Sequence, residues 1–169
     1  VACPAGSYCL ARSSSPLQCA PGGFSDVGGL DACLECDAGT FQSSSNATAC
    51  EACDAGKAVS TDQTLCEECD AGKYGATVEG TGELQCTTCP LDWFSREDGA
   101  AACAQCPSGW ATDSAFRACD PCPSGKFENQ TSRACQDCPA KWASAGGLVD
   151  CTECTEGEVT GSAHAACSK

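Results

Sequence analysis

Large apolar side chains are scarce in this sequence. The chain of 169 residues has no methionine and no isoleucine, and leucine, valine and phenylalanine together supply 19 residues. That share, about 11%, lies below the roughly 20% at which a highly charged chain is expected to remain disordered. Ordering a chain costs about 1.5 kcal/mol per residue, which so few large side chains cannot offset. The fold therefore needs a covalent contribution to its stability.

Other absences exclude whole classes of function. The only histidine, His164, lies in the polar stretch "GSAHAAC", where nothing points to a catalytic base or a ligand. No apolar run approaches the ~20 residues of a membrane span. The net charge is −14, from 9 basic and 23 acidic residues, so the chain has no electrostatic reason to bind nucleic acid or an anionic membrane. We expect no catalytic residue, no cofactor and no enzymatic activity, and we interpret the charge as favouring solubility.

Cysteine is the abundant residue. Twenty cysteines in 169 residues, about 12%, exceed the level typical of a disulfide scaffold. Their number is even, so all of them can pair. Dense cysteine indicates an oxidising compartment, and we expect an extracellular or cell-surface protein. The chain begins with Val1, without methionine or a signal peptide, so we expect a processed form or a fragment.

The cysteines introduce a repeated phrase, C-x-x-G-x-aromatic, which a polar loop and a closing cysteine follow. From Cys19 onward the period is 16 or 17 residues, except for one repeat of 20 residues that contains "VEGTGELQ". The sequence thus predicts an N-terminal partial unit, residues 1–18, followed by tandem repeats over residues 19–169. The repeats of this second part begin at Cys19, Cys36, Cys53, Cys69, Cys89, Cys106, Cys122, Cys138 and Cys154.

The repeated positions predict the local structure. Glycine stands third after the opening cysteine in eight of ten phrases, which indicates a turn with positive φ or a close backbone approach. Asp92 and Lys141 replace it in the other two, so the turn does not demand glycine absolutely. The aromatic that follows is expected to cover a neighbouring disulfide. We predict a small disulfide-rich fold, an elongated tandem array of ~16–20-residue units with short β-ribbons and turns and almost no helix.

Eight C-x-x-C motifs, from Cys33/Cys36 to Cys151/Cys154, could bind zinc, carry out redox chemistry or belong to neighbouring disulfides. A redox motif would need a strand–helix context that is missing here. If each C-x-x-C motif acts as one unit, as part of a zinc site or as an internal disulfide, then four cysteines remain without a partner: Cys3, Cys9, Cys19 and Cys167. If the opening cysteine of each repeat instead pairs with the closing cysteine across the loop, no cysteine remains. We therefore expect no metal site. Crossed pairs between adjacent repeats remain open. The favoured disulfides are Cys3–Cys9, Cys19–Cys33, Cys36–Cys50, Cys53–Cys66, Cys69–Cys86, Cys89–Cys103, Cys106–Cys119, Cys122–Cys135, Cys138–Cys151 and Cys154–Cys167.

Such crosslinks are local. Closing a loop of about 14 residues contributes roughly 3 kcal/mol in the chain-entropy model, and contacts then run between sequence neighbours. With this pairing no bridge spans the two-residue spacer inside each C-x-x-C. We therefore expect bending to concentrate at the spacers unless packing or a partner chain supports them.

Modification and ion-binding motifs lie in the loops. The sequons at Asn46 and Asn129 both fall between an opening and a closing cysteine, and we expect N-linked glycans on both. The carboxylates Glu67, Glu68 and Asp70, with Glu79 and Glu83, match no calcium-loop spacing. A solvated acidic face is the better interpretation of them.

The phrase "CPAGxY/F…C-x-x-C" resembles the cysteine-rich repeat named for ephrin receptors, and it is similar to the first module of tumour-necrosis-factor-receptor cysteine-rich domains. The resemblance covers essentially the whole chain from Cys3. It implies an extracellular, elongated, glycosylated array with loop-closing disulfides. Long tandem arrays of this kind are common in surface proteins of algae and protists, where some build cell coats or flagellar hairs.

We therefore expect a non-enzymatic extracellular structural rod, a component of a surface coat or of a filament such as a flagellar hair. Its expected partners are further copies of itself or other surface or filament proteins. The alternative is a receptor-type ectodomain that binds a protein ligand, and a third possibility is a thiol–disulfide enzyme. A receptor would show irregular units or an exposed aromatic patch where its ligand docks, and an enzyme would show free thiols.

Overall fold

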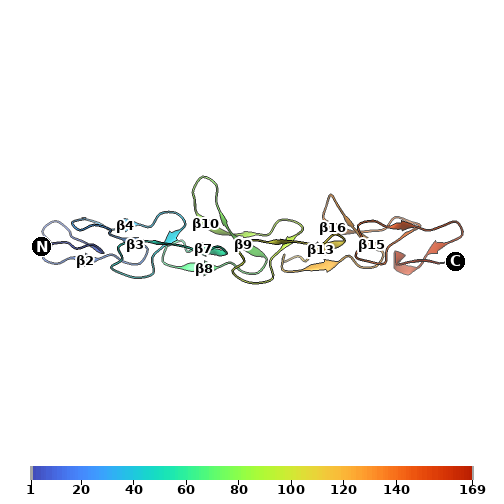
Figure 1. Cartoon of the computed structure of the whole chain (residues 1–169), viewed down its shortest axis with the longest axis horizontal. Coiled ribbons are helices and arrows are strands. Elements are labelled where there is room, and N and C mark those ends of the chain that lie inside the picture. Colours follow the sequence, from blue (N-terminus) through green and yellow to red (C-terminus); the bar gives the residue numbers. More distant parts are fainter. Residues whose placement is uncertain (1, 169) are drawn as a thin grey trace. The chain divides into compact units, whose positions relative to one another are not determined.

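The computed structural model describes residues 2–168 and consists of short two-stranded antiparallel ribbons, one in each repeat (Figure 1). A first body contains residues 2–70, 74–87 and 98–102, and a second body contains 71–73, 88–97 and 103–168. In the first body the ribbons are β1 (Ser7–Tyr8) with β2 (Leu17–Gln18), β3 (Gly23–Phe24) with β4 (Leu34–Glu35), β5 (Thr40–Phe41) with β6 (Glu51–Ala52), β7 (Lys57–Val59) with β8 (Cys66–Glu68), and most of β9 (Lys73–Thr77) with β10 (Leu84–Thr88).

The second body continues the same series of ribbons. Among the described residues, the 3₁₀ turn η1 (Ser162–His164) is the only helical segment. The fold class predicted from the repeats, a small disulfide-rich tandem array with short ribbons and almost no helix, is confirmed. The ribbons here are β11 (Trp93–Phe94) with β12 (Ala104–Gln105), β13 (Trp110–Thr112) with β14 (Cys119–Pro121), β15 (Lys126–Asn129) with β16 (Ala134–Asp137), β17 (Trp142–Ala143) with β18 (Thr152–Glu153), and β19 (Val159–Thr160) with β20 (Cys167–Ser168).

The ribbons are short because each repeat has room for only one turn, one strand, one loop and a return strand. In most repeats the first strand follows the turn and carries the aromatic, and the second contains the C-x-x-C spacer. In the Cys19 repeat, for example, Phe24 lies opposite Leu34 and Gly23 opposite Glu35. The spacer is therefore a paired strand and not a free linker.

Backbone hydrogen bonds also cross each of these spacers within a body. The amide of the next opening cysteine donates to the carbonyl of the preceding turn, as from Cys36 to Gly22 at 3.2 Å and from Cys122 to Gly109 at 2.9 Å. No disulfide spans a spacer, as the favoured pairing predicts, and these main-chain hydrogen bonds add a support that the sequence-based expectation of bending did not include. The spacers are consequently supported from within each body.

In four repeats a second backbone bond joins the repeat to the next one. The amide of the turn glycine donates to the carbonyl of the residue that stands sixth after the next opening cysteine. This bond measures 2.8 Å from Gly6 to Ser25 and again 2.8 Å from Gly125 to Ser144. Neighbouring repeats are thus joined by main-chain atoms, whose contribution depends little on side-chain identity.

The buried interior consists mainly of disulfides and small polar groups. Cysteine supplies most of the buried apolar side chains. Serine stands at the sixth position of three repeats, where Ser25 and Ser144 are almost fully buried. Each serine forms a local turn, since Ser25 Oγ donates to the Val27 carbonyl at 2.8 Å and Ser144 Oγ accepts from the Gly146 amide at 3.1 Å. Buried polar groups need such partners, which explains how a chain with few large side chains still has an interior.

Candidate functional site

The 20 cysteines form ten disulfides, each joining the opening cysteine of a repeat to the closing cysteine of the same repeat, with no free thiol. The Cα atoms of a pair lie 5.3 to 5.9 Å apart. The two cysteines of every C-x-x-C motif therefore belong to different disulfides. In this arrangement no motif holds two thiolates for a metal ion or for disulfide exchange.

The turn glycines are the sites where one repeat meets the repeat two positions further along. A Cβ added to Gly56, whose φ is +85°, would lie 2.0 Å from the Gly99 carbonyl oxygen. At Gly109, with φ +84°, the Gly147 carbonyl oxygen would lie 2.1 Å away. Real Cβ atoms do not approach that closely, so these positions need glycine for space as well as for backbone conformation.

The two turns that lack glycine keep the same backbone. Asp92 and Lys141 have φ values of 71° and 69°, in the left-handed region that costs a residue with a side chain roughly 1–2 kcal/mol. The prediction that the turn can form without glycine holds, at the expense of this strain. In the Cys89 repeat the aspartate has a specific role, because its side chain is part of an interior ion cluster.

The Asp92–Arg133–Glu128 cluster is the most unusual polar feature of the second body. Asp92 and Glu128 are 2% and 0% exposed, and Arg133 lies between them. Arg133 Nη2 donates to Asp92 Oδ2 in a short contact, and its Nη1 lies 2.6 Å from Glu128 Oε1. The hydrogen bond to Asp92 raises the pKa of the Arg133 guanidinium above its ordinary value, and the negative charge of Glu128 adds to this effect.

Further hydrogen bonds connect the cluster to its surroundings. The Gly109 amide donates to Glu128 Oε2 at 2.7 Å, and Gln105 Nε2 donates to Asp92 Oδ2 at 3.0 Å. The cluster thus joins the turn of the Cys89 repeat to the loop of the Cys122 repeat, across the repeat between them. Sequence reasoning missed it. Two departures from the repeat pattern were the available signal. Asp92 stands where most repeats have the turn glycine. Glu128 stands at the sixth position, which is serine in three other repeats, as Ser25, Ser95 and Ser144.

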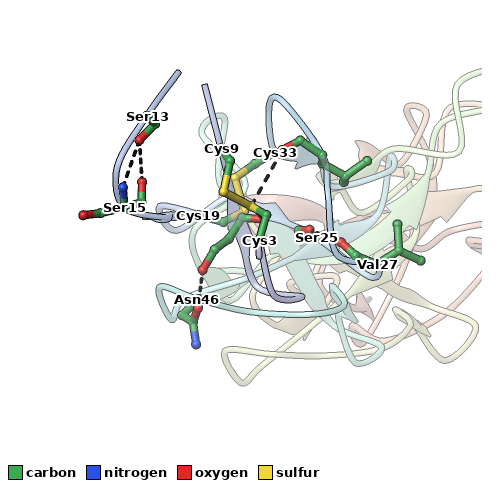
Figure 2. Close-up of a disulfide and its surroundings, with 11 residues drawn as sticks. Cys3, Cys9, Ser13, Ser15, Cys19, Ser25, Val27, Cys33 and Asn46 are labelled. Atoms are coloured by element: carbon green, nitrogen blue, oxygen red, sulfur yellow. Dashed lines mark hydrogen bonds between the residues drawn. A yellow bond between two sulfur atoms is a disulfide. The ribbon is translucent and has the colours of Figure 1, made fainter. Parts of the chain in front are cut away.

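The two sequons lie on loops of different geometry. Asn46 is exposed, Ser7 Oγ donates to its Oδ1 at 3.1 Å, and Figure 2 shows its amide nitrogen pointing away from the neighbouring segments. Asn129 is half-buried at the end of β15, where its Nδ2 donates to Gln136 Oε1 at 2.9 Å. Its Oδ1 accepts from the Thr131 and Ser132 amides. Of the two acceptor nitrogens, the one of Asn46 is the more accessible in the folded chain.

The remaining candidates form no chemical centre. Among residues 2–168, no three His, Cys, Asp or Glu side chains gather as a metal site would require. His164 is partly buried, with Nδ1 3.3 Å from the Trp142 carbonyl oxygen. A search of the same residues finds no helix long and apolar enough to span a membrane. Glu68 lies 3.9 Å from Lys57 Nζ.

An open hollow of about 360 Å³ in the first body lies between the β3/β4 ribbon and the loop around Asp62. Small-molecule sites are usually concave, mostly apolar and able to bury most of their ligand. This hollow is open and its lining is more polar than apolar, so it does not match that description. Its lining residues are Ala20, Pro21, Gly22, Gly23, Cys33, Leu34, Glu35, Thr61, Asp62 and Gln63.

The chain matches a protein-family model. The family model described as tyrosine-protein kinase ephrin type A/B receptor-like matches residues 22–64 and 75–116, which together make up half of the chain. No curated protein matches the chain significantly. The matched segments contain the turn, aromatic and C-x-x-C positions whose geometry is described above.

Proposed function

The chain belongs to the ephrin-receptor-like cysteine-rich family, and from this premise we propose that it is an extracellular, non-enzymatic structural component of a surface coat or of a filament such as a flagellar hair. The observation that carries the proposal is the use of the same main-chain contacts between successive repeats. Such contacts build a continuous support from repeats whose side chains vary. No single repeat stands out as the site of a reaction.

Two features support an extracellular location. Ten disulfides with no free cysteine are stable in an oxidising environment and rare in the reducing cytosol. The family is also named for a receptor. The acidic net charge of −14 keeps such a chain soluble at high local density.

Glycans on the loops fit the same role. We propose that Asn46 and Asn129 carry N-linked sugar, since both sequons lie on polar loops at the edge of a repeat. Mass spectrometry of intact glycopeptides from native material should find sugar at both residues. Unmodified asparagine at both positions would refute this part of the proposal.

Immunogold electron microscopy of unpermeabilised cells tests the structural role. Antibodies raised against the chain should label a regular extracellular coat or filament at repeated intervals. A free-thiol assay on the same native protein should detect no reactive cysteine. Labelling confined to internal membranes, or a stoichiometric reactive thiol, would contradict the proposal.

A receptor ectodomain remains the second candidate, because the second body exposes two large apolar side chains close together in the sequence. Leu91 is 65% exposed and Trp93, two residues further on, is 38% exposed. Tryptophan is enriched in protein–protein hot spots. If these side chains hold a protein ligand, the variant Trp93→Ser should lose a cell-surface crosslinking partner that Leu148→Ser, also at an exposed apolar residue, retains.

A further inference from the structure

The contact between a glycine turn and the loop that lies on it is made by main-chain atoms, which do not distinguish one repeat from another. In the second body, a Cβ added to Gly72 would lie 2.1 Å from the Ala115 carbonyl oxygen. One added to Gly109 would lie 2.1 Å from the Gly147 carbonyl oxygen. The φ values of these two turns, +87° and +84°, are almost the same. Such contacts hold a loop in place without selecting which loop occupies which turn.

The disulfides give the folding chain little further selection. In the Cys89, Cys106 and Cys122 repeats, the paired cysteines are separated by 14, 13 and 13 residues. Pairing with the closing cysteine of the following repeat roughly doubles the loop, which lowers the probability of closure only about threefold. Wrong combinations of turn and loop are therefore close competitors of the native one.

One turn and one loop of the second body differ from the others in charge. Asp92 takes the glycine position of its turn, and Arg133 stands in the loop between β15 and β16 (Figure 1). Glu128 is the only acidic residue at the sixth position of a repeat. Arg133 pairs with both carboxylates. All three charges therefore meet only when the Cys122 loop lies on the Cys89 turn.

The preceding loop contains a similar arginine, so the turn must distinguish two related loops. Arg117 and Arg133 both stand two residues before the closing cysteine of their repeat. The Arg117 Cγ lies 3.5 Å from the Cβ position of Gly72, and its Nε donates to the Ala71 carbonyl at 3.3 Å. Arg117 thus bonds to a main-chain carbonyl on a glycine turn, whereas Arg133 bonds to the buried carboxylate of Asp92.

The repeat between the two, which begins at Cys106, is joined to the same cluster. At four other junctions the turn amide donates to a main-chain carbonyl, as from Gly125 to Ser144 at 2.8 Å. The Gly109 amide instead donates to Glu128 Oε2 at 2.7 Å. A carboxylate has replaced a main-chain acceptor here, so the order of three consecutive repeats depends on side chains.

The cluster is a poor source of stability by itself. Asp92 has a left-handed φ of 71°, and Asp92 and Glu128 are both removed from water. Replacing a buried ion cluster with neutral residues often leaves stability unchanged or raises it, whereas a buried charge without its partner is strongly unfavourable. Buried polar groups can thus select one arrangement over its competitors without adding net stability.

We propose that the Asp92–Arg133–Glu128 cluster is a registry device, which directs the Cys122 loop to the Cys89 turn while the chain folds. A different loop on that turn buries Asp92 without its counter-charge, so this combination is rejected before its cysteines pair. The inference concerns how the array is built, and it goes beyond the proposed role in a coat or filament.

Oxidative refolding of the reduced chain in a glutathione buffer tests the inference. A protein thiolate displaces reduced glutathione from a mixed disulfide, and oxidised glutathione takes up the two electrons of each new bond. The cluster variant combines Asp92→Gly, Glu128→Ser and Arg133→Asn, which removes all three charges. When half of the unchanged chains have native pairs in the second body, at most a third as many chains of the variant should have them. Non-reducing peptide mapping of alkylated samples measures these fractions.

The matched control removes the same charges from exposed positions outside the cluster, in the variant Arg12→Asn, Glu97→Ser and Glu153→Ser. It should refold like the unchanged chain. The wrong pairs of the cluster variant should join cysteines between Cys89 and Cys135, while pairing in the first body stays native.

The stability of the folded state separates registry from simple stabilisation. The natively paired cluster variant should unfold at a denaturant concentration no lower than the unchanged chain. A lower midpoint, or no natively paired variant at all, would overturn the proposal, because the cluster would then be needed for stability itself. Equal recovery of native pairs by the cluster variant and the unchanged chain, or wrong pairs spread equally over both bodies, would overturn it as well.

Discussion

At the scale of single residues, the interior of this protein is polar and disulfide-linked. Ser25 and Ser144 are buried within turns that their own hydroxyl groups stabilise. Both stand sixth after the opening cysteine, and in the Cys122 repeat the charged residue Glu128 stands at that position. A buried carboxylate is tolerated only when paired and hydrogen-bonded. Arg133 and the Gly109 amide provide those partners, so Glu128 depends on residues of two other segments.

Removing Arg133 should therefore open the second body locally. In Arg133→Met, Asp92 and Glu128 would remain buried without their counter-charge, and the hydrogen-exchange protection of the Gly109 and Glu128 amides should fall about a hundredfold. The triple variant Asp92→Gly, Glu128→Ser and Arg133→Asn removes all three charges and introduces the turn glycine and the sixth-position serine found in other repeats. It should keep protection close to that of the unchanged chain. Equal losses in both variants would show that the charges do not act as a set.

Asp62 provides a prediction on pH. Hydrogen bonds from the Ser60 and Thr64 side chains, at 2.6 and 2.8 Å, hold the pKa of its carboxyl below the ordinary 3.8. A carboxyl with a lowered pKa in the folded state stabilises that state above its unfolded pKa, and the stabilisation is lost as the pH falls through the folded pKa. Carbon-detected NMR titration should show Asp62 titrating below 3.8, and Ser60→Ala should move it upward. A titration midpoint unchanged by that substitution would contradict the assignment.

At the scale of elements, the ribbon, the turn and the loop of different repeats form one contact system. The ribbon contains the spacer, and the turn lies against a loop from two repeats later. At Asn46, Gly99 and Gly147 the loop amide also donates to the carbonyl of the opening cysteine between them. Each element is too short to be stable alone, because an isolated two-stranded hairpin is marginal in water. The unit of stability is therefore at least three consecutive repeats.

Substitution at a covered turn should be more disruptive than at an open one. Gly80→Ala adds only the strain of alanine at positive φ, about 1–2 kcal/mol. Gly109→Ala adds the same strain and also places a methyl group 2.1 Å from the Gly147 carbonyl oxygen. Hydrogen exchange followed by mass spectrometry should show lost protection around residues 145–148 in Gly109→Ala. In Gly80→Ala any change should stay within the β9/β10 loop, and similar effects of the two variants would argue against docking as the reason for glycine.

The disulfide pairing makes a further prediction at this scale. Cys50 and Cys53 should belong to different disulfides, Cys36–Cys50 and Cys53–Cys66, as they do in the structure. Non-reducing peptide mapping, with cleavage inside the Glu51–Ala52 spacer, decides it. Recovery of a Cys50–Cys53 pair, or a stoichiometric zinc signal with reduced thiols, would overturn both the pairing and the proposed structural role.

At the scale of the whole molecule, the contacts within each body join repeats that are one or two positions apart. Proteins built from such nearest-neighbour contacts are quasi-one-dimensional. We therefore expect a radius of gyration far above the roughly 15 Å of a compact chain of this length. Small-angle X-ray scattering at low protein concentration, to suppress association, measures it. A value near the compact one would exclude the rod.

Much of this fold could be predicted from the sequence, for a physical reason. The cysteine phrase and its period describe short segments of the chain, and the even number of cysteines allows each one to pair within its own segment. These features determine the ribbon, the turn and the pairing favoured within each repeat. The glycine at the turn was also recognisable, although the sequence left positive φ and close approach as equal explanations. The structure shows that Gly56 and Gly109 need both.

Only the tertiary structure decided what the repeats do to one another. Asp92 and Arg133 are 41 residues apart, and no period or motif predicts that an arginine from one loop enters the space above an aspartate in a distant turn. The support across the spacers likewise comes from carbonyls of other repeats. Local sequence determines the structure of one repeat because the contacts within a repeat are local. Contacts between residues of different repeats form only when the neighbouring repeats are stacked, so only the tertiary structure shows them.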